Sequence, residues 1–109
     1  MAVAKLLVMY PMPKDMAAFE RAYSAEHIPK AAPIFKAAGA TKVVFTKMVG
    51  APAGTPAFHR IAEIHFPSAA VLQACAASQA GRDALAHAHK ISNGGPPIIL
   101  FGEEEVVTF

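Results

Sequence analysis

Short apolar runs alternate along the chain with longer stretches of helical periodicity. The runs are bounded by Pro and Gly, which mark turns, and TKVVFTKMV is rich in the β-branched residues that favour strands. Asp15 and Ser68 stand where they can cap the two helical stretches, and Gly81 is expected to interrupt the second stretch. The pattern predicts strands over residues 4–10, 41–49, 58–66 and 98–109, with helical structure between Asp15 and Gly39 and between Ser68 and Ser92. This β-α-β-β-α-β order predicts a single ferredoxin-like α+β domain over residues 1–109, with a four-stranded antiparallel sheet.

Apolar residues occupy both faces of the predicted strands. In the first strand, Leu6 and Val8 lie on one face and Leu7 and Met9 on the other, because side chains alternate along a strand. Two helical stretches can cover only one face of such a sheet. We therefore expect a second copy of the chain to cover the other face, giving a homodimer that packs sheet against sheet. The alternative is a monomer with a large exposed apolar patch.

The first helical stretch carries the most suggestive side chains. Phe19, Tyr23 and His27 recur at steps of four and so share one helix face, while Pro29 and Pro33 predict a kink or a restart after them. Histidine titrates near neutral pH, so His27 can act as an acid or a base in a cavity. The alternative is a histidine held at a helix end, where the helix dipole stabilises its charged form.

The other histidines and acidic residues form weaker patterns. His59, Glu63 and His65 share one strand parity, but at about 3.3 Å per residue along a strand they lie too far apart to hold one metal ion. We expect Glu63 to lie in a cavity or an interface and the two histidines to be structural. His87 and His89 are two residues apart on a helix, so their side chains diverge and cannot share an ion. We expect both to be solvated or partly packed.

Composition and charge narrow the function classes. The chain has 109 residues, of which 54% are hydrophobic, and a formal net charge of +2 with no basic stripe. Such a distribution argues against a nucleic-acid partner. The single cysteine, Cys75, excludes an internal disulfide, a cysteine-based zinc site and a cysteine-ligated iron–sulfur cluster within one chain. No targeting segment is visible, nor an apolar run of the ~20 residues that cross a bilayer, so we expect a cytoplasmic protein with no membrane partner.

Several stretches together resemble the EthD family of the dimeric α/β-barrel superfamily. The N-terminal part, KLLVMYPMPKDMAAFERAYSAEHIPKA, contains a Tyr-x-x-x-His-x-Pro element at Tyr23, His27 and Pro29. HRIAEIHFPS, GRDALAHAH and ILFGEEEVV also resemble parts of the family, so the resemblance covers nearly the whole chain. It implies a barrel formed between two subunits, with a cavity in each sheet. Members are associated with the degradation of ethers and similar small organic molecules, but the family has no agreed reaction.

The resemblance and the residues together predict a protein that acts on a small molecule. We expect an enzyme of the oxygenase (oxidoreductase) or isomerase and cyclase type, which converts a small, largely apolar organic molecule without a cofactor or a metal. His27 would be its acid/base and Tyr23 the hydrogen-bond partner. The alternative is a non-catalytic carrier or an accessory protein of an oxygenase system. The residues expected to line the cavity are Tyr10, Phe45, Ile61, Glu63 and Phe101.

Overall fold

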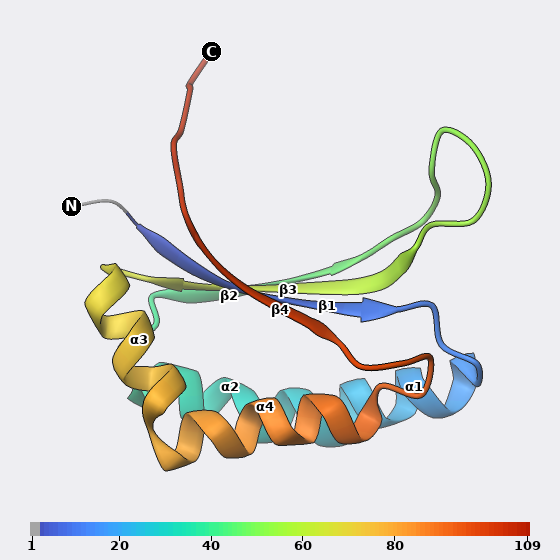
Figure 1. The fold of residues 1–109 in the computed structure, drawn as a ribbon, viewed down its shortest axis with the longest axis horizontal. Coiled ribbons are helices and arrows are strands. Elements are labelled where there is room, and N and C mark those ends of the chain that lie inside the picture. The colour runs from blue at the N-terminus through green and yellow to red at the C-terminus, as the bar shows by residue number, and fades with distance from the viewer. Residues whose placement is uncertain (1–2) are drawn as a thin grey trace.

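Four strands form one antiparallel sheet, and the helical segments lie on one side of it (Figure 1). The computed structural model describes residues 3–109. The strands are β1 (Ala4–Pro11), β2 (Lys42–Lys47), β3 (Phe58–Phe66) and β4 (Ile98–Glu103), and their order in the sheet is β2-β3-β1-β4. The helical segments are α1 (Met16–Ala22), the π-helix η1 (Tyr23–His27), α2 (Ile28–Ala37), α3 (Ala69–Ala77) and α4 (Gln79–Ile91). The predicted ferredoxin-like α+β fold is confirmed.

Helical structure continues through α1, η1 and α2 and accommodates both prolines. Asp15 caps α1 by accepting a hydrogen bond from the Ala18 amide at 3.0 Å. Pro29 has no N–H for the carbonyl four positions earlier, and its ring would clash with that carbonyl in an α-helix. The wider π-helical turn of η1 ends at His27, two residues before Pro29, and relieves this conflict, and Pro33 lies within α2. A local change of helix type therefore replaces the predicted kink.

The second helical stretch breaks at Ser78, not at Gly81 as predicted. Ser78 ends α3 in an extended conformation and caps α4, accepting a hydrogen bond from the Gly81 amide at 3.0 Å. Gly81 is required inside the first turn of α4, because a Cβ there would lie 1.9 Å from the Cys75 carbonyl oxygen. The serine thus restarts the helix, and the glycine leaves room for the tight turn.

The sheet presents different side chains on its two faces. On the helix face, Ala4, Leu6, Val8 and Tyr10 of β1 are buried, whereas the alternate residues of the strand point away from the helices and are half-buried. We call that second side the open face. Its residues, by strand register, include Lys5, Leu7, Met9, Val44, Ile61, Glu63, Ile98 and Leu100.

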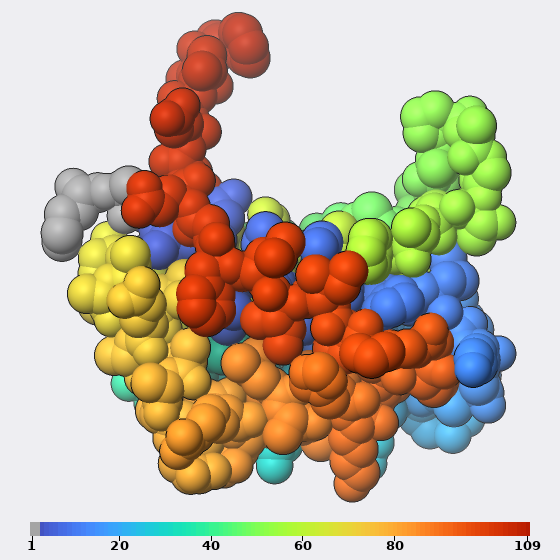
Figure 2. Space-filling view, viewed as in Figure 1, coloured from blue at the N-terminus to red at the C-terminus, as the bar shows by residue number. Residues whose placement is uncertain are grey.

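Two segments rise on the side of the open face (Figures 1 and 2). One is the loop between β2 and β3, and the other is the C-terminal segment that follows β4. The predicted last strand over 98–109 is too long, because β4 ends at Glu103 and residues 104–109 have no regular secondary structure. The C-terminal segment carries the exposed apolar side chains of Val106, Val107 and Phe109. Apolar surface therefore extends beyond the sheet on this side of the molecule.

A β-bulge reverses the direction of His59. The register between β1 and β3 shifts after Tyr10, so that His59 has no residue opposite it. The His59 ring is buried and packs edge-on against Phe19 of α1, with ring centroids 5.8 Å apart. His59 therefore lies on the helix face, and the prediction that it shares a face with Glu63 and His65 is wrong.

Candidate functional site

His27 lies at the centre of a buried hydrogen-bonded chain. It ends η1 and is 6% exposed. Its Nε2 is 3.2 Å from the hydroxyl oxygen of Tyr10 on β1, and its Nδ1 is 2.9 Å from Nδ1 of His87 on α4. The two imidazole rings are nearly parallel, with an interplanar angle of 9°. Three elements that are distant in the sequence thus meet at one imidazole, and both of its ring nitrogens are engaged.

Aromatic rings surround this chain on the helix face. Tyr10 packs edge-on against both Phe19 and Tyr23, with centroids 5.3 Å apart in each case, and the Tyr23 and His27 centroids are 5.9 Å apart. The predicted hydrogen bond between Tyr23 and His27 is absent, because the Tyr23 hydroxyl has no partner among residues 3–109. A buried hydroxyl without a partner costs about 1–3 kcal/mol. Tyr23 is therefore a polar group that a bound molecule can satisfy.

The surroundings keep both histidines neutral at neutral pH. Burial, together with the nearby His87 and Lys30, lowers the pKa of His27 to about 4. Burial also lowers the pKa of His87; Lys30 and Lys90 act in the same direction, and Glu26 acts in the opposite one. A neutral imidazole has one N–H, so the bond between the two Nδ1 atoms contains a single proton. Each ring of the pair therefore keeps one nitrogen without a proton at neutral pH.

Burial makes the two tyrosines of the cluster weak acids. It raises the pKa of Tyr10 far above its usual value, with a further contribution from Tyr23. It also raises the pKa of Tyr23 to about 12, against the opposing effect of the Arg60 charge. Both hydroxyls stay protonated at neutral pH and can donate hydrogen bonds. The centre of the cluster is therefore uncharged and suits a ligand that is largely apolar.

An ion pair borders the cluster beside the β-bulge. The Arg60 guanidinium carbon lies 5.0 Å from the centroid of the Tyr23 ring, and Arg60 donates hydrogen bonds of 2.9 and 3.2 Å to the Glu20 carboxylate. Although burial acts to raise the pKa of Glu20, the hydrogen bond and charge of Arg60 hold it below its usual value. The pair fixes α1 to β3 and keeps one face of the Tyr23 ring next to a cation.

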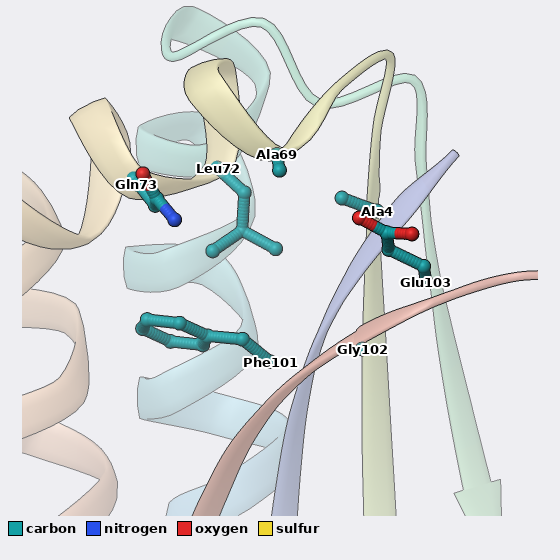
Figure 3. Close-up of a pocket in the computed structure, with 7 residues that line it drawn as sticks. All are labelled: Ala4, Ala69, Leu72, Gln73, Phe101, Gly102 and Glu103. Atoms are coloured by element: carbon teal, nitrogen blue, oxygen red, sulfur yellow. The ribbon is translucent and has the colours of Figure 1, made fainter. Parts of the chain in front are cut away.

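Three of the predicted lining residues lie on the helix face, at two separate places. Tyr10 belongs to the cluster, and Phe45 packs edge-on against Tyr23, with centroids 6.0 Å apart. Phe101 lines a different cavity of about 160 Å³ between the start of β1, β4 and α3, where Leu72 lies next to it (Figure 3). Phe101 therefore does not join the other two.

The remaining two predicted lining residues lie on the open face. The register pairs Ile61 with Met9 and Glu63 with Leu7, and Glu63 Oε1 is 3.4 Å from Lys5 Nζ. The sheet itself separates these side chains from His27. The predicted set of lining residues is thus divided between two faces, because alternation within a strand does not reveal which residues of two paired strands share a face.

A cavity of about 420 Å³ lies between α2 and the β2 edge of the sheet. Its volume falls in the range of small-molecule sites. Phe45 forms part of its wall and also contacts the Tyr23 ring, so one aromatic side chain stands between this cavity and the cluster. The residues that line it are Ala32, Lys36, Ala40, Thr41, Lys42, Val43 and Phe45.

Two kinds of feature are absent from the part of the chain that the structure describes. Residues 3–109 contain no group of three or more His, Cys, Asp or Glu side chains that could hold a metal ion. The same residues contain no helix that combines the length and the apolar character needed to cross a membrane.

His87 is the site residue that the sequence pattern missed. Its spacing from His89 argues only against a metal ion shared by those two and says nothing about a partner on another helix. The structure shows that α4 buries Gly81, Ala84, Ala88 and Ile91, and His87 lies at the edge of this stripe. The i, i+3, i+4, i+7 spacing of 84, 87, 88 and 91 is the signal that indicates an inward-facing histidine.

The sequence matches a known family and an uncharacterised relative. Residues 13–92 match the EthD domain. Over 105 residues the chain is 30% identical to an uncharacterised 11.0 kDa protein from the thcB–thcC intergenic region of Rhodococcus erythropolis, and the match covers 94% of this chain and 97% of that protein.

Solved structures share the fold. A crystal structure of an EthD family protein from Bacillus halodurans has a TM-score of 0.84 and 27% identity, covering 94% of this chain and 99% of that one. An EthD-like protein from Ralstonia eutropha has a TM-score of 0.73 and 19% identity, with 94% and 91% covered. A dimeric ferredoxin-like protein of unknown function from a Jannaschia species has a TM-score of 0.64 and 18% identity, with 95% and 99% covered.

Proposed function

The chain belongs to the EthD family, and from this premise we propose that it binds a small, largely apolar organic molecule beside the Tyr23–His27 cluster and converts it without a cofactor. In this proposal the Tyr23 hydroxyl binds a polar atom of the ligand, and His27 is the acid/base. The reaction begins with removal of a proton from the ligand, as an isomerase or an oxygenase without a cofactor requires. In the oxygenase form, the resulting carbanion itself reduces molecular oxygen.

One juxtaposition carries the proposal: an unpartnered buried hydroxyl stands beside a buried, neutral histidine. Buried side-chain polar groups nearly always have a hydrogen-bond partner, and the Tyr23 hydroxyl has none among residues 3–109. The neighbouring His27 is kept uncharged by burial, so it retains a proton-accepting nitrogen at neutral pH. Apolar side chains would fill the same space without these desolvation costs. A bound molecule with one polar atom accounts for the arrangement.

The cavity beside Phe45 supplies a route for the ligand. Its walls are apolar at Val43 and Phe45, and the ring of Phe45 is the side chain that separates it from Tyr23. A rotation of Phe45 would join the cavity to the cluster, and such side-chain changes are common on ligand binding. Lys36 and Lys42 line the same cavity, so a ligand with an acidic or acceptor group at its outer end would suit it best.

Binding without conversion is the second candidate, and one observation favours it. Both ring nitrogens of His27 are engaged by protein groups, Nε2 by Tyr10 and Nδ1 by His87. Neither nitrogen is free to take a proton directly from a ligand in this arrangement. A carrier, or an accessory protein of an oxygenase system, would need only the cavity and the Tyr23 hydroxyl.

Two variants separate the candidates. Native mass spectrometry with a panel of small aromatic and ether compounds identifies ligands, and Tyr23→Phe, which removes only the hydroxyl, is expected to weaken binding about tenfold. His27→Gln is expected to retain binding and to lower kcat by about 10²–10⁴-fold if the protein is an enzyme. Ligand binding by the wild type with no turnover in air supports the carrier. Binding that is unchanged in Tyr23→Phe contradicts the proposed site.

We also propose that a second copy of the chain covers the open face. Val44 on β2 and Ile98 and Leu100 on β4 are 37%, 42% and 48% exposed there. These are the two edge strands, and the half-buried Leu7, Met9 and Ile61 of the central strands continue the apolar surface between them. Contiguous apolar surface of this kind marks an interaction site in a stable soluble protein. The fold relative from Jannaschia is described as dimeric, which supports an isologous pairing of two sheets.

A further inference from the structure

We propose that Tyr10, His27 and His87 form a proton relay from the buried site to solvent, with His87 as its outlet. The relay rests on the proposed function only in requiring that a proton leave the ligand, and it adds that Tyr10 receives that proton and passes its own to His27. Its basis is a continuous chain of hydrogen bonds, 3.2 Å from the Tyr10 oxygen to His27 Nε2 and 2.9 Å from His27 Nδ1 to His87 Nδ1. Exposure rises along the same path, because Tyr10 and His27 are buried and His87 is half-buried. The chain therefore has one buried end and one end near water.

Two neutral arrangements of protons satisfy this chain. In the first, the Tyr10 hydroxyl donates to His27 Nε2, His27 Nδ1–H donates to His87 Nδ1, and His87 Nε2 carries its own proton. In the second, His87 Nδ1–H donates to His27 Nδ1, His27 Nε2–H donates to the Tyr10 oxygen, and the Tyr10 hydroxyl proton is free for a ligand. A tyrosine oxygen accepts and donates at the same time, and each imidazole keeps one proton in both arrangements.

Passage from the first arrangement to the second moves one proton from ligand to water. The ligand's bond to its acidic hydrogen breaks, and that proton bonds to the Tyr10 oxygen as the Tyr10 hydroxyl proton passes to His27 Nε2. His27 passes its Nδ1 proton to His87 Nδ1, and His87 releases its Nε2 proton to water. The ligand keeps the electron pair and becomes an anion, while all three protein groups are neutral before and after. Because Tyr10 rather than His27 meets the ligand, the engagement of both His27 nitrogens does not prevent catalysis.

The relay requires the histidine pair to contain a single proton between its facing nitrogens. If both rings were protonated, N–H groups would lie on both Nδ1 atoms, which at 2.9 Å would repel each other. The charged and titratable groups that face the pair are Lys30, Lys90, Glu26, Tyr10 and Tyr23. The lysines oppose protonation of the rings, and the single carboxylate favours protonation of His87 alone. The surroundings thus hold the pair in the state that the relay needs.

The test measures proton exchange rather than turnover. In protein labelled with ¹⁵N at histidine, NMR identifies which ring nitrogen of His27 is protonated. Saturation transfer from water then measures how fast the His27 ring proton and the Tyr10 hydroxyl proton exchange with water. We expect His87→Phe to slow this exchange by about a hundredfold, the smallest contribution typical of a positioned acid–base group. His89→Phe is the matched control, because His89 is exposed on the same helix, and it should leave the exchange unchanged.

Exchange that remains as fast in His87→Phe as in the wild type overturns the relay, whether or not any compound is turned over. Should that variant fail to fold, His87→Gln decides, because glutamine retains hydrogen bonding but cannot pass a proton between two ring nitrogens. Slowed exchange in either variant, together with the absence of turnover for every compound, supports the relay and contradicts the catalytic proposal. The two proposals can therefore fail separately.

Discussion

The two faces of the sheet are made from the same strands but differ in how completely one chain satisfies them. On the helix face, Leu6, Val8 and Tyr10 are buried, and the polar groups there are enclosed by aromatic rings and helices. On the open face, the alternate residues Leu7 and Met9 remain half-buried, and no helix of residues 3–109 lies over them (Figure 1). One chain therefore encloses the side chains of the helix face but leaves those of the open face uncovered, and it is there that we propose a second copy.

The largest expected effect compares two neighbouring leucines. Leu6→Ala should lower the free energy of unfolding by about 2–5 kcal/mol, because Leu6 is buried in the core of one chain. Leu7→Ala should have a smaller effect at low protein concentration and a larger one at high concentration, because a dimer adds its own stabilisation. Urea denaturation over a wide range of protein concentrations measures both.

Two results would contradict this expectation. A wild-type midpoint that does not depend on protein concentration, together with a monomer in light scattering, would remove the second copy from the open face. An effect of Leu7→Ala equal to that of Leu6→Ala at every concentration would mean that one chain already encloses both faces.

The next effect is acid destabilisation that originates on the helix face. The pKa of His27 is about 4 in the folded protein, against 6.5 when unperturbed, so the unfolded chain binds the proton first as the pH falls. Stability from this group is complete above pH 6.5 and is lost as the pH falls toward 4; the total is about 3 kcal/mol, with about 2 kcal/mol lost by pH 5. His87, whose pKa is also lowered, acts in the same direction.

His27→Leu is the variant that tests this source. It should flatten the pH dependence of the unfolding free energy between pH 6.5 and 5, measured by urea denaturation. Glu20 has a pKa lowered from 4.5, so its own loss of stability begins below that range. A slope that is the same in the variant and the wild type would place the acid-sensitive group elsewhere.

Sequence patterns predicted the fold well, because each strand and helix has its own period and capping residue. Asp15 and Ser68 cap helices as expected, and the two-sided apolar strands indicated an uncovered face. The errors arose where a feature depends on pairing. The change to a π-helix before Pro29 and the bulge at His59 depend on how neighbouring turns and strands fit together.

The candidate site was predictable only in part, for the same reason. His27 and Tyr23 lie one helical turn apart, so local periodicity places them together. Tyr10 and His87 reach His27 from other elements, across 17 and 60 positions of sequence, and no local spacing encodes those contacts. The sequence pattern places Ile61 and Glu63 in the same cavity as Tyr10, because it does not contain the pairing between β1 and β3. The observed register puts both residues on the opposite face.

The smallest expected effect compares one ion pair on each face. Arg60 donates two hydrogen bonds to Glu20 on the helix face, whereas Lys5 and Glu63 on the open face are 3.4 Å apart and partly solvated. Arg60→Gln should lower the free energy of unfolding by about 1–2 kcal/mol, because it breaks charge-assisted hydrogen bonds that water only partly screens.

Lys5→Gln should produce a smaller change in the dilute monomer. Its partly solvated contacts with Glu63 and Glu104, at 3.4 and 3.0 Å, lack the two hydrogen bonds that join Arg60 to Glu20 and are largely offset by side-chain entropy and screening. Urea denaturation at about 0.1 M and about 1 M NaCl checks both variants, since salt screens the contacts of the Lys5 charge more than the hydrogen-bonded Arg60–Glu20 pair. The wild-type advantage over Arg60→Gln should therefore persist at high salt. The opposite result would be a larger loss in the free energy of unfolding for Lys5→Gln than for Arg60→Gln in dilute protein. It would mean that contacts within one chain stabilise the open face more than its exposure indicates, and that the two faces differ less than we propose.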